Sequence, residues 1–465
     1  MLCRSWLRTG SSVVLIALSL SGDVVVAQEP RGELVQMVVE LLQNKDKDMR
    51  SAALEQIRYE AKGPAATVQF ANQLPKLTPV AQSELLRALA TRGDSSAKAQ
   101  VLSLFKTSND TSIRSEAVEA LGELGDPTDL PLLMTAINGE SIEIQTAAKK
   151  SLARMRHASV NQLLIEAMKN VPATTQASLI EVLVARRAVE AMPQISIATV
   201  DKDSKVRRAA MNALAELGTV NQIPAMVQGI LMAEKGGERD AAEKAVVNLC
   251  NRIEKPDMRA EPVLASRAKL DDASQLELLS VVAKIGGPKA LEAVQVTMAS
   301  TNPTQRDVGL KAFCNWPDPG ISDQLAKMIE TTSNANERGI EFKALVRLAG
   351  TRDKRSDLDR LSRFKQAMSL ASSTEERSLV INKCRSAYSV DTMRFVLPFL
   401  DQPEFAEIAS ETIVELAHHR EVREPNKAEF DQVLDRVLLI SKDATTKDRA
   451  IRYKKGETWQ RPKGS

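Results

Sequence analysis

The chain has 465 residues, with 63 Lys and Arg against 60 Asp and Glu, and its formal net charge is +3. Apolar residues make up 43%, which is enough for a packed core and excludes a chain that is disordered throughout. Aromatic residues are only 3%, which disfavours β-sandwiches and barrels, and the small net charge gives no reason to expect nucleic-acid binding.

Residues 1–27 have the pattern of an export signal. Two arginines precede a short apolar run over residues 13–20, and Val25 and Ala27 stand at positions −3 and −1 of a cleavage site before Gln28. The run is shorter than the ~20 residues of a membrane-spanning helix. We therefore expect cleavage between Ala27 and Gln28 and export to the periplasm or the cell exterior; an uncleaved anchor and a cytosolic N-terminus are the alternatives.

A repeat of about 31 residues follows the signal. Residues 110–125 and 203–218 carry the same Asp, Arg, Ala, Ala, Leu, Glu, Leu and Gly at the same spacing. The equivalent positions are Asp110 and Asp203, Arg114 and Arg207, and Leu121 and Leu214. With the arginine position as an anchor, the register extends to twelve units. The anchors are Arg50, Gln82, Arg114, Gln145, Gln176, Arg207, Arg239, Gln275, Arg306, Arg338, Arg377 and Glu407.

Two columns of residues support this register. Seven residues past the anchor, all twelve units have an apolar residue. Four residues before it, nine units have Asp, Asn, Ser or Thr, whose side-chain oxygens cap helix starts. Each unit thus predicts a capped helix of about fourteen residues, a turn and a second helix. One such hairpin cannot bury its own apolar faces, so the units must stack into a solenoid over residues 28–441.

The pattern Asp-x-x-[Val/Ile/Met]-Arg-x-x-Ala-x-x-Ala-Leu-x-x-Leu-Gly resembles HEAT repeats, specifically the short HEAT-like repeats of the phycobilisome-lyase type. Residues 110–137 and 203–231 match best, and residues 46–57 and 302–329 match more weakly. Residues 309–349 also resemble repeat regions of large exported bacterial proteins. The resemblance implies an all-α fold, a right-handed α-solenoid (α-α superhelix) of about twelve helical hairpins, and a role in binding other proteins.

The same resemblance implies no chemistry, because the motif residues are structural. It does imply a ladder of motif Asp and Arg side chains along the stack, with Asp110/Arg114 and Asp203/Arg207 as candidates. Independent, solvated charges at these positions are the alternative.

Residues with catalytic or ligand chemistry are scattered. The signal aside, the cysteines are Cys250, Cys314 and Cys384, an odd number at wide spacing, which we expect to be reduced and buried. His418 and His419 are adjacent, so on a helix they point about 100° apart and do not form a metal site by themselves. Trp316 could be a binding anchor or could fill a gap between hairpins. We therefore expect no catalytic residues, no cofactor and no metal site.

Residues 442–465 hold eight Lys or Arg and three Asp or Glu. We expect a basic C-terminal tail that is flexible; a contact for anionic lipids or polysaccharide is the alternative.

The interpretation that these patterns favour is an exported, non-catalytic scaffold for protein–protein interactions. Its protein partner is unknown, and we expect neither nucleic-acid binding, nor an integral membrane span, nor a small-molecule substrate. One alternative is an enzyme-associated or chromophore-handling lyase-like HEAT protein, since some relatives of that type act on bilins. Another is an envelope- or polysaccharide-binding module that uses the basic tail.

Overall fold

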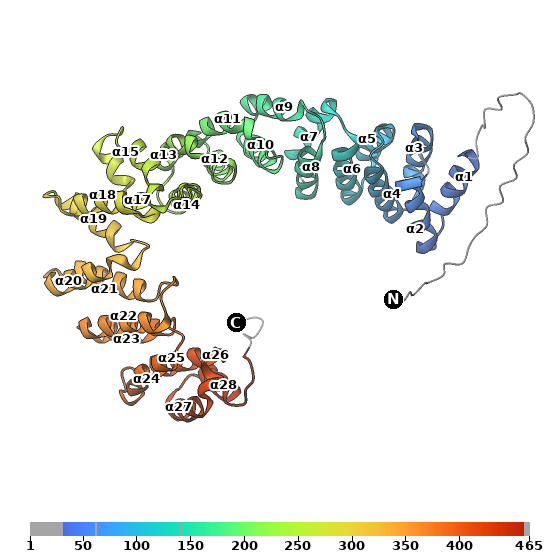
Figure 1. The fold of residues 1–465 in the computed structure, drawn as a ribbon. Coiled ribbons are helices and arrows are strands. Elements are labelled where there is room, and N and C mark those ends of the chain that lie inside the picture. Colours follow the sequence, from blue (N-terminus) through green and yellow to red (C-terminus); the bar gives the residue numbers. More distant parts are fainter. Residues whose placement is uncertain (1–30, 61–62, 140, 460–465) are drawn as a thin grey trace, which may run out of the picture. The chain divides into compact units, whose positions relative to one another are not determined.

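The computed structural model describes residues 31–60, 63–139 and 141–459, which form helices and turns without a strand among them (Figure 1). The described residues divide into two compact units, the first ending at Val160 and the second beginning at Asn161. Each is an α-solenoid, a stack of helical hairpins in which helices pack on the helices of neighbouring hairpins. The predicted signal, with Ala27 and Gln28, lies outside the described residues.

In the first unit, the helices that carry the anchor positions pack against one another in chain order. They are α2 (Lys47–Glu55, extended by the π-helical turn Gln56–Glu60), α4 (Pro79–Arg92), α6 (Thr111–Leu124) and α8 (Ile142–Arg154). The remaining helices are α1 (Arg31–Leu42), α3 (Pro64–Ala71), α5 (Lys98–Thr107) and α7 (Leu130–Ile137). Each of α5 and α7 packs on the anchor helix that follows it in the chain.

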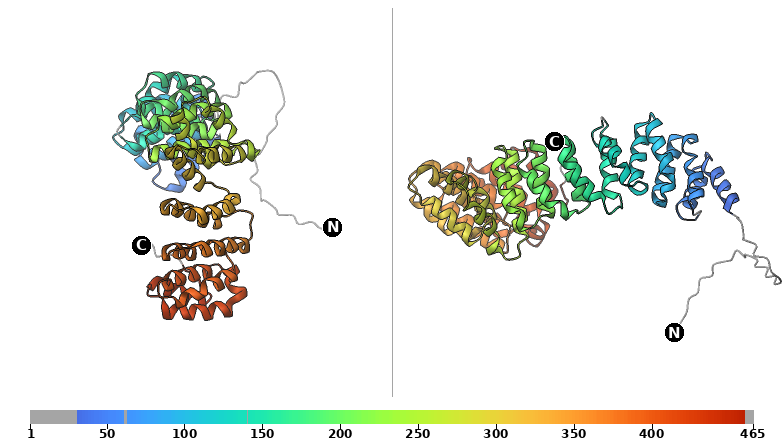
Figure 2. Two further views of the ribbon diagram at one scale, coloured as in Figure 1. Left: turned by 90° about the vertical axis from the view of Figure 1, so that its left-hand side faces the viewer. Right: turned by 90° about the horizontal axis from the view of Figure 1, so that it is seen from above.

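The second unit repeats this plan, and its hairpins from α20 onward lie one above another (Figure 2). Its anchor helices are α10 (Ala173–Ala185), α12 (Ser204–Leu217), α14 (Gly237–Asn251), α16 (Asp272–Glu277) with α17 (Leu279–Ile285), α19 (Pro303–Cys314), α21 (Ala335–Ala349), α23 (Thr374–Cys384) and α25 (Ala406–His418). The other helices are α9 (Val160–Ala167, at the boundary), α11 (Met192–Ile197), α13 (Ile223–Met232), α15 (Glu261–Arg267), α18 (Pro288–Met298), α20 (Ser322–Thr331), α22 (Asp357–Leu370), α24 (Val390–Val396), α26 (Arg420–Arg423), α27 (Lys427–Ile440) and α28 (Ala444–Lys454).

The predicted core column is buried in every unit. All twelve residues that stand seven past an anchor have no exposed surface. They are Ile57, Leu89, Leu121, Leu152, Leu183, Leu214, Val246, Val282, Phe313, Leu345, Cys384 and Val414. The register taken from the sequence therefore places these side chains between neighbouring helices, as the helical period requires.

The predicted helix starts are also present. Eight of the nine polar residues four before an anchor accept a backbone N–H from the first turn of their helix. Asp110 accepts from the amides of Ser112 and Ile113, and Asp203 accepts from that of Lys205. Thr78 stands at the N-cap of α4 without a side-chain cap bond. These bonds satisfy amides that the helix itself leaves unpaired.

The structure corrects the expected flexible tail. Residues 444–454 form α28, which packs on α25 and α27, and Ala450 and Tyr453 are buried. Asp443 caps this helix by accepting a hydrogen bond from the amide of Thr446. The solenoid therefore continues past residue 441. The basic composition misled the prediction because cations such as Arg452 lie on the exposed face of an amphipathic helix.

Candidate protein-binding surface

Charged side chains link successive units of the stack. Arg207 on α12 is buried, and its Nε and one Nη each lie 2.8 Å from a carboxylate oxygen of Glu238 on α14. The other Nη of Arg207 donates to the carbonyls of Asp201 and Lys202. The hydrogen bonds from Arg207 lower the pKa of the Glu238 carboxyl below its usual value. Equivalent pairs are Arg50–Glu84, Arg239–Glu277 and Arg338–Glu376.

This ladder differs from the one that the family resemblance implies. Within the part of the chain that the structure describes, Asp110 and Asp203 form no ion pair with Arg114 or Arg207 and instead cap their own helices. The anchor arginines that are paired use a glutamate of the following unit. The expectation of an Asp–Arg ladder is therefore corrected to an Arg–Glu ladder between neighbouring units.

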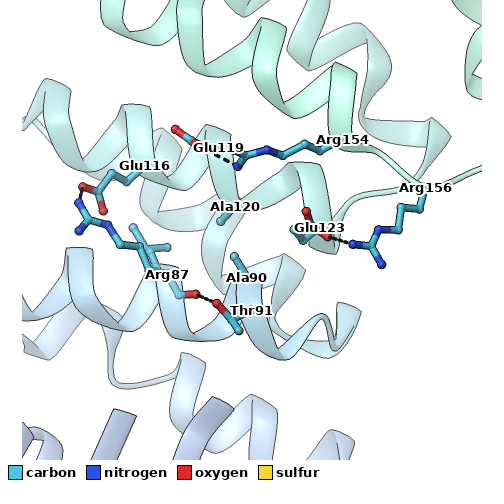
Figure 3. Close-up of a pocket in the computed structure, with 10 residues that line it drawn as sticks. Arg87, Ala90, Thr91, Glu116, Glu119, Ala120, Glu123, Arg154 and Arg156 are labelled. Carbon is cyan, nitrogen blue, oxygen red and sulfur yellow. Dashed lines mark hydrogen bonds and ion pairs between the residues drawn. The ribbon is translucent and has the colours of Figure 1, made fainter. Parts of the chain in front are cut away.

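A groove of about 630 Å³ crosses three consecutive anchor helices of the first unit (Figure 3). We call it the α4–α6–α8 groove. Its lining residues are Leu86, Arg87, Ala90 and Thr91 from α4, Glu116, Glu119, Ala120 and Glu123 from α6, and Arg154 and Arg156 from the end of α8 and just beyond it. The lining combines small apolar side chains with charged groups of both signs.

The charges of this groove are arranged by helix geometry. Glu116, Glu119 and Glu123 are three and four residues apart, so they share one face of α6. Each pairs with a cation from another segment. The ion pairs are Arg87–Glu116 at 2.5 Å, Arg154–Glu119 at 3.0 Å and Arg156–Glu123 at 3.5 Å.

The arginine side chains of these pairs are 52–86% exposed, so water already solvates them. Exposed ion pairs add little stability, about 0–1 kcal/mol each. A partner's charged side chains could therefore replace them at small cost. The arrangement suits recognition of a polypeptide segment that carries charges beside small apolar groups.

Sequence reasoning missed this surface. The glutamate spacing on α6 was visible, but the cations lie on segments about 30 residues away, and only the stacking of α4, α6 and α8 brings them together. The pair Arg87–Glu116 also involves Ser83, whose hydroxyl donates to the same carboxylate.

The residues considered for chemistry lie apart. Among the described residues, no group of three or more His, Cys, Asp or Glu could hold a metal ion. Burial raises the pKa of the Cys250 and Cys314 thiols to about 12, so both are protonated at neutral pH. Cys384 is buried as well. All three therefore behave as small core side chains.

His418, His419 and Trp316 have structural roles. His418 shares a hydrogen bond of 2.9 Å between its Nδ1 and the Tyr453 hydroxyl, and His419 stacks on the Tyr388 ring. Trp316 is buried, and Arg347 donates to its carbonyl oxygen. Trp316 therefore fills a gap between hairpins and is not an exposed binding anchor.

Glu341 on α21 is the one carboxylate in the column three residues past the anchors. It is 2% exposed; the Thr332 hydroxyl donates to its Oε1 at 3.0 Å, and its Oε2 has no hydrogen-bond partner within the described residues. Burial in this position raises the pKa of the Glu341 carboxyl above its ordinary value of 4.5.

Glu341→Gln is expected to change how stability depends on pH. Above pH 4.5 the unfolded chain loses the Glu341 proton while the folded chain keeps it, so this residue makes folding less favourable as the pH rises through the raised pKa. The glutamine variant cannot titrate and lacks that decline. Urea unfolding from pH 4 to pH 8 measures the difference, and parallel stability curves for the two proteins would contradict the assignment.

The fold and its surface define an all-α repeat protein of the solenoid class. Residues 67–153 match the family model of HEAT repeats, a range that contains α4, α6 and nearly all of α8. The match supports a HEAT-repeat protein and agrees with the motif found in residues 110–125. No curated protein matches the chain.

Solved structures with similar folds include karyopherins. Kap121p bound to the extreme C-terminus of the protein phosphatase Cdc14p is 11% identical with a TM-score of 0.47, covering 90% of this chain and 55% of that one. Kap95p in a structure with RanGDP is 11% identical with a TM-score of 0.46, covering 93% and 66%. Human deoxyhypusine hydroxylase is 17% identical with a TM-score of 0.25, covering 61% and 96%. This chain thus spans little more than half the length of Kap121p.

Proposed function

We propose that this chain is an exported, non-catalytic HEAT-repeat scaffold that binds a protein partner through the α4–α6–α8 groove. The observation that carries the proposal is that three successive repeats together form one groove, lined by ion pairs whose arginine side chains are exposed. Stacked repeats bind partners on such extended surfaces, because neighbouring units contribute side chains at regular intervals. We assign the repeats to the short phycobilisome-lyase-like type because the motif in residues 110–125 and 203–218 resembles that type.

Two further observations support parts of this proposal. The pattern of residues 1–27 supports export, with Gln28 as the first residue of the mature chain. No described helix has the length and apolar character that crossing a membrane requires. The alternative of a surface-binding module that uses the basic tail stays a prediction. The packing of α28 changes only its setting, since most of that segment is a helix of the solenoid.

The binding proposal is tested by removing the groove cations. Arg87→Ala, Arg154→Ala and Arg156→Ala are combined in one variant, and Arg394→Ala, Arg436→Ala and Arg452→Ala, which alter exposed ion pairs of the second unit, are combined in a matched control. Each protein is expressed in its source and cross-linked in the exported fraction, and cross-linked peptides are quantified by mass spectrometry. We expect the groove variant to lose the partner's cross-links at least ten-fold while the control keeps them.

Equal retention in both variants, or equal loss, would contradict the groove as the binding surface. Thermal unfolding of each variant shows whether the fold is intact. The N-terminal sequence of the exported protein tests the signal, and a start at Gln28 is expected. A visible absorbance band in protein purified from its source would contradict the assignment as a scaffold without a chromophore.

A further inference from the structure

Arg114 and Arg207 hold the same position in their units but differ in their partners. Arg207 meets Glu238, which stands one residue before the next anchor, Arg239. The corresponding residue after Arg114 is Ile144, one before the anchor Gln145. The repeat that contains Arg114 therefore has the arginine of the ladder, but the next repeat lacks the glutamate that pairs with this arginine elsewhere.

The Arg114 guanidinium is nevertheless held in place. Its Nε donates to the carbonyl of Phe105 at 3.3 Å, and its guanidinium carbon lies 5.2 Å from the centre of the Phe105 ring. Within the described part of the chain, neither of its Nη atoms has a hydrogen-bond or ion-pair partner. A guanidinium that is half-buried and fixed in orientation is prepared for a bidentate contact with a carboxylate.

Arg114 faces a groove of about 730 Å³ between α5, α7 and the starts of α6 and α8. We call it the Arg114 groove. Its lining includes the apolar residues Phe105, Pro131, Leu132 and Ile144, together with Thr111, Thr135 and Ser141. A carboxylate bound there would lie beside apolar groups that limit access of water and so strengthen its attraction to the guanidinium.

Two other anchor arginines, Arg306 and Arg377, also have no ion-pair partner among the described residues. Both are exposed, so water solvates their guanidinium groups, and neither is among the residues that line the Arg114 groove. The combination of a half-buried, oriented guanidinium and an adjoining groove therefore distinguishes Arg114 from them.

We propose that the Arg114 groove binds a glutamate side chain of a partner protein, with an apolar residue of the same segment packed beside it. The bound carboxylate accepts hydrogen bonds from the two Nη atoms of Arg114, because the Nε of Arg114 already donates to the Phe105 carbonyl. Glu238 differs in detail, since it accepts from the Nε and one Nη of Arg207. This inference rests on the proposed function, because it supplies the scaffold with a second contact and names the residue class that the contact recognises.

The test measures binding of a defined probe to the full chain. The probe is a pool of fluorescein-labelled nonapeptides with a central Glu flanked by Leu, and its match is the same pool with a central Gln. Fluorescence anisotropy is expected to show that the Glu pool binds at least about ten-fold more tightly. Arg114→Met should abolish this preference, and Arg306→Met, the control on an exposed anchor, should keep it.

A second variant tests the same geometry without removing the arginine. Ile144→Glu places a carboxylate where Glu238 stands in the Arg207 unit, so it should occupy Arg114 from within the chain and abolish the Glu preference. A preference that survives both Arg114→Met and Ile144→Glu would overturn the proposal, as would the absence of any preference in the wild-type chain.

A third variant, Glu140→Gln, tests whether a carboxylate of this chain itself occupies the site. Glu140 lies near Ile144 in sequence but outside the described residues. A Glu preference that arises only in this variant would show that the chain fills its own site, and would also overturn the proposal. The two failures are distinguishable. If only this inference fails, the α4–α6–α8 groove variant still loses the partner's cross-links and its control keeps them. If the proposed function fails, the groove variant and its control no longer differ in those cross-links.

Discussion

Arg207→Ala is expected to lower the free energy of unfolding by about 3 kcal/mol, the scale of removing one partner of a buried ion pair. Glu238 would lose its ion-pair partner in a site where only 10% of its side chain is exposed, and the carbonyls of Asp201 and Lys202 would lose their donors. Urea unfolding followed by circular dichroism measures the loss. Hydrogen exchange should show that it is concentrated in α12 and α14, because each hairpin is stabilised mainly by its neighbours.

Two controls separate burial from charge. Arg394 makes the same bidentate contact with Glu429, with both N–O distances at 2.8 Å, but its side chain is 51% exposed, so Arg394→Ala should cost far less. The double variant Arg207→Met/Glu238→Met should recover most of the stability that Arg207→Ala loses, since it removes both buried charges and keeps apolar volume. Equal losses in the Arg207 and Arg394 variants would show that burial does not set the strength of the ladder.

The helices and their buried faces could be predicted because both depend on local chemistry. A cap such as Asp110 bonds to amides two and three residues away, and the spacing from Arg114 to Leu121 is two turns of one helix. At some repeats the residue four before the anchor is not a polar cap, because the helix there begins at another residue. At Lys235 the helix begins two residues later, after Gly236, whose φ of 103° suits glycine.

Contacts between units could not be predicted in the same way. Glu238 and Glu84 both pair with the anchor arginine of the preceding unit, yet Glu238 stands one residue before its own anchor and Glu84 stands two after. Which acid meets which arginine depends on how two helices slide and turn against each other, and the pattern within one unit does not determine that. The same reason hid both grooves of the first unit, whose lining residues come from several segments.

The tail shows the limit of composition as a guide. A net positive charge predicted a flexible segment, but only one face of α28 has to be apolar for the helix to pack, and Ala450 and Tyr453 provide it. The signal of a thirteenth anchor-type helix was present in Asp443, which caps α28 as Asp110 caps α6. Helix caps were therefore a better guide to the end of the solenoid than net charge was.

Leu214→Ala is expected to lower the free energy of unfolding by about 2–5 kcal/mol. Leu214 has no exposed surface, and its helix, α12, packs on both α10 and α14, so truncation removes apolar contacts and leaves a cavity in a layer shared by neighbouring units. Leu121 on α6 holds the equivalent place in the first unit and should lose a similar amount. Urea unfolding of the full chain measures both changes.

Leu439→Ala is the matched control, because that leucine lies on α27 with 85% of its surface exposed. Its loss should stay within about 0.5 kcal/mol, the range of an ordinary surface substitution. Hydrogen exchange should show that the effect of Leu214→Ala is concentrated in α10, α12 and α14, because each hairpin in a stack is stabilised mainly by contacts with its neighbours. A Leu214→Ala loss no larger than that of Leu439→Ala would mean that the column seven residues past the anchors does not form the core.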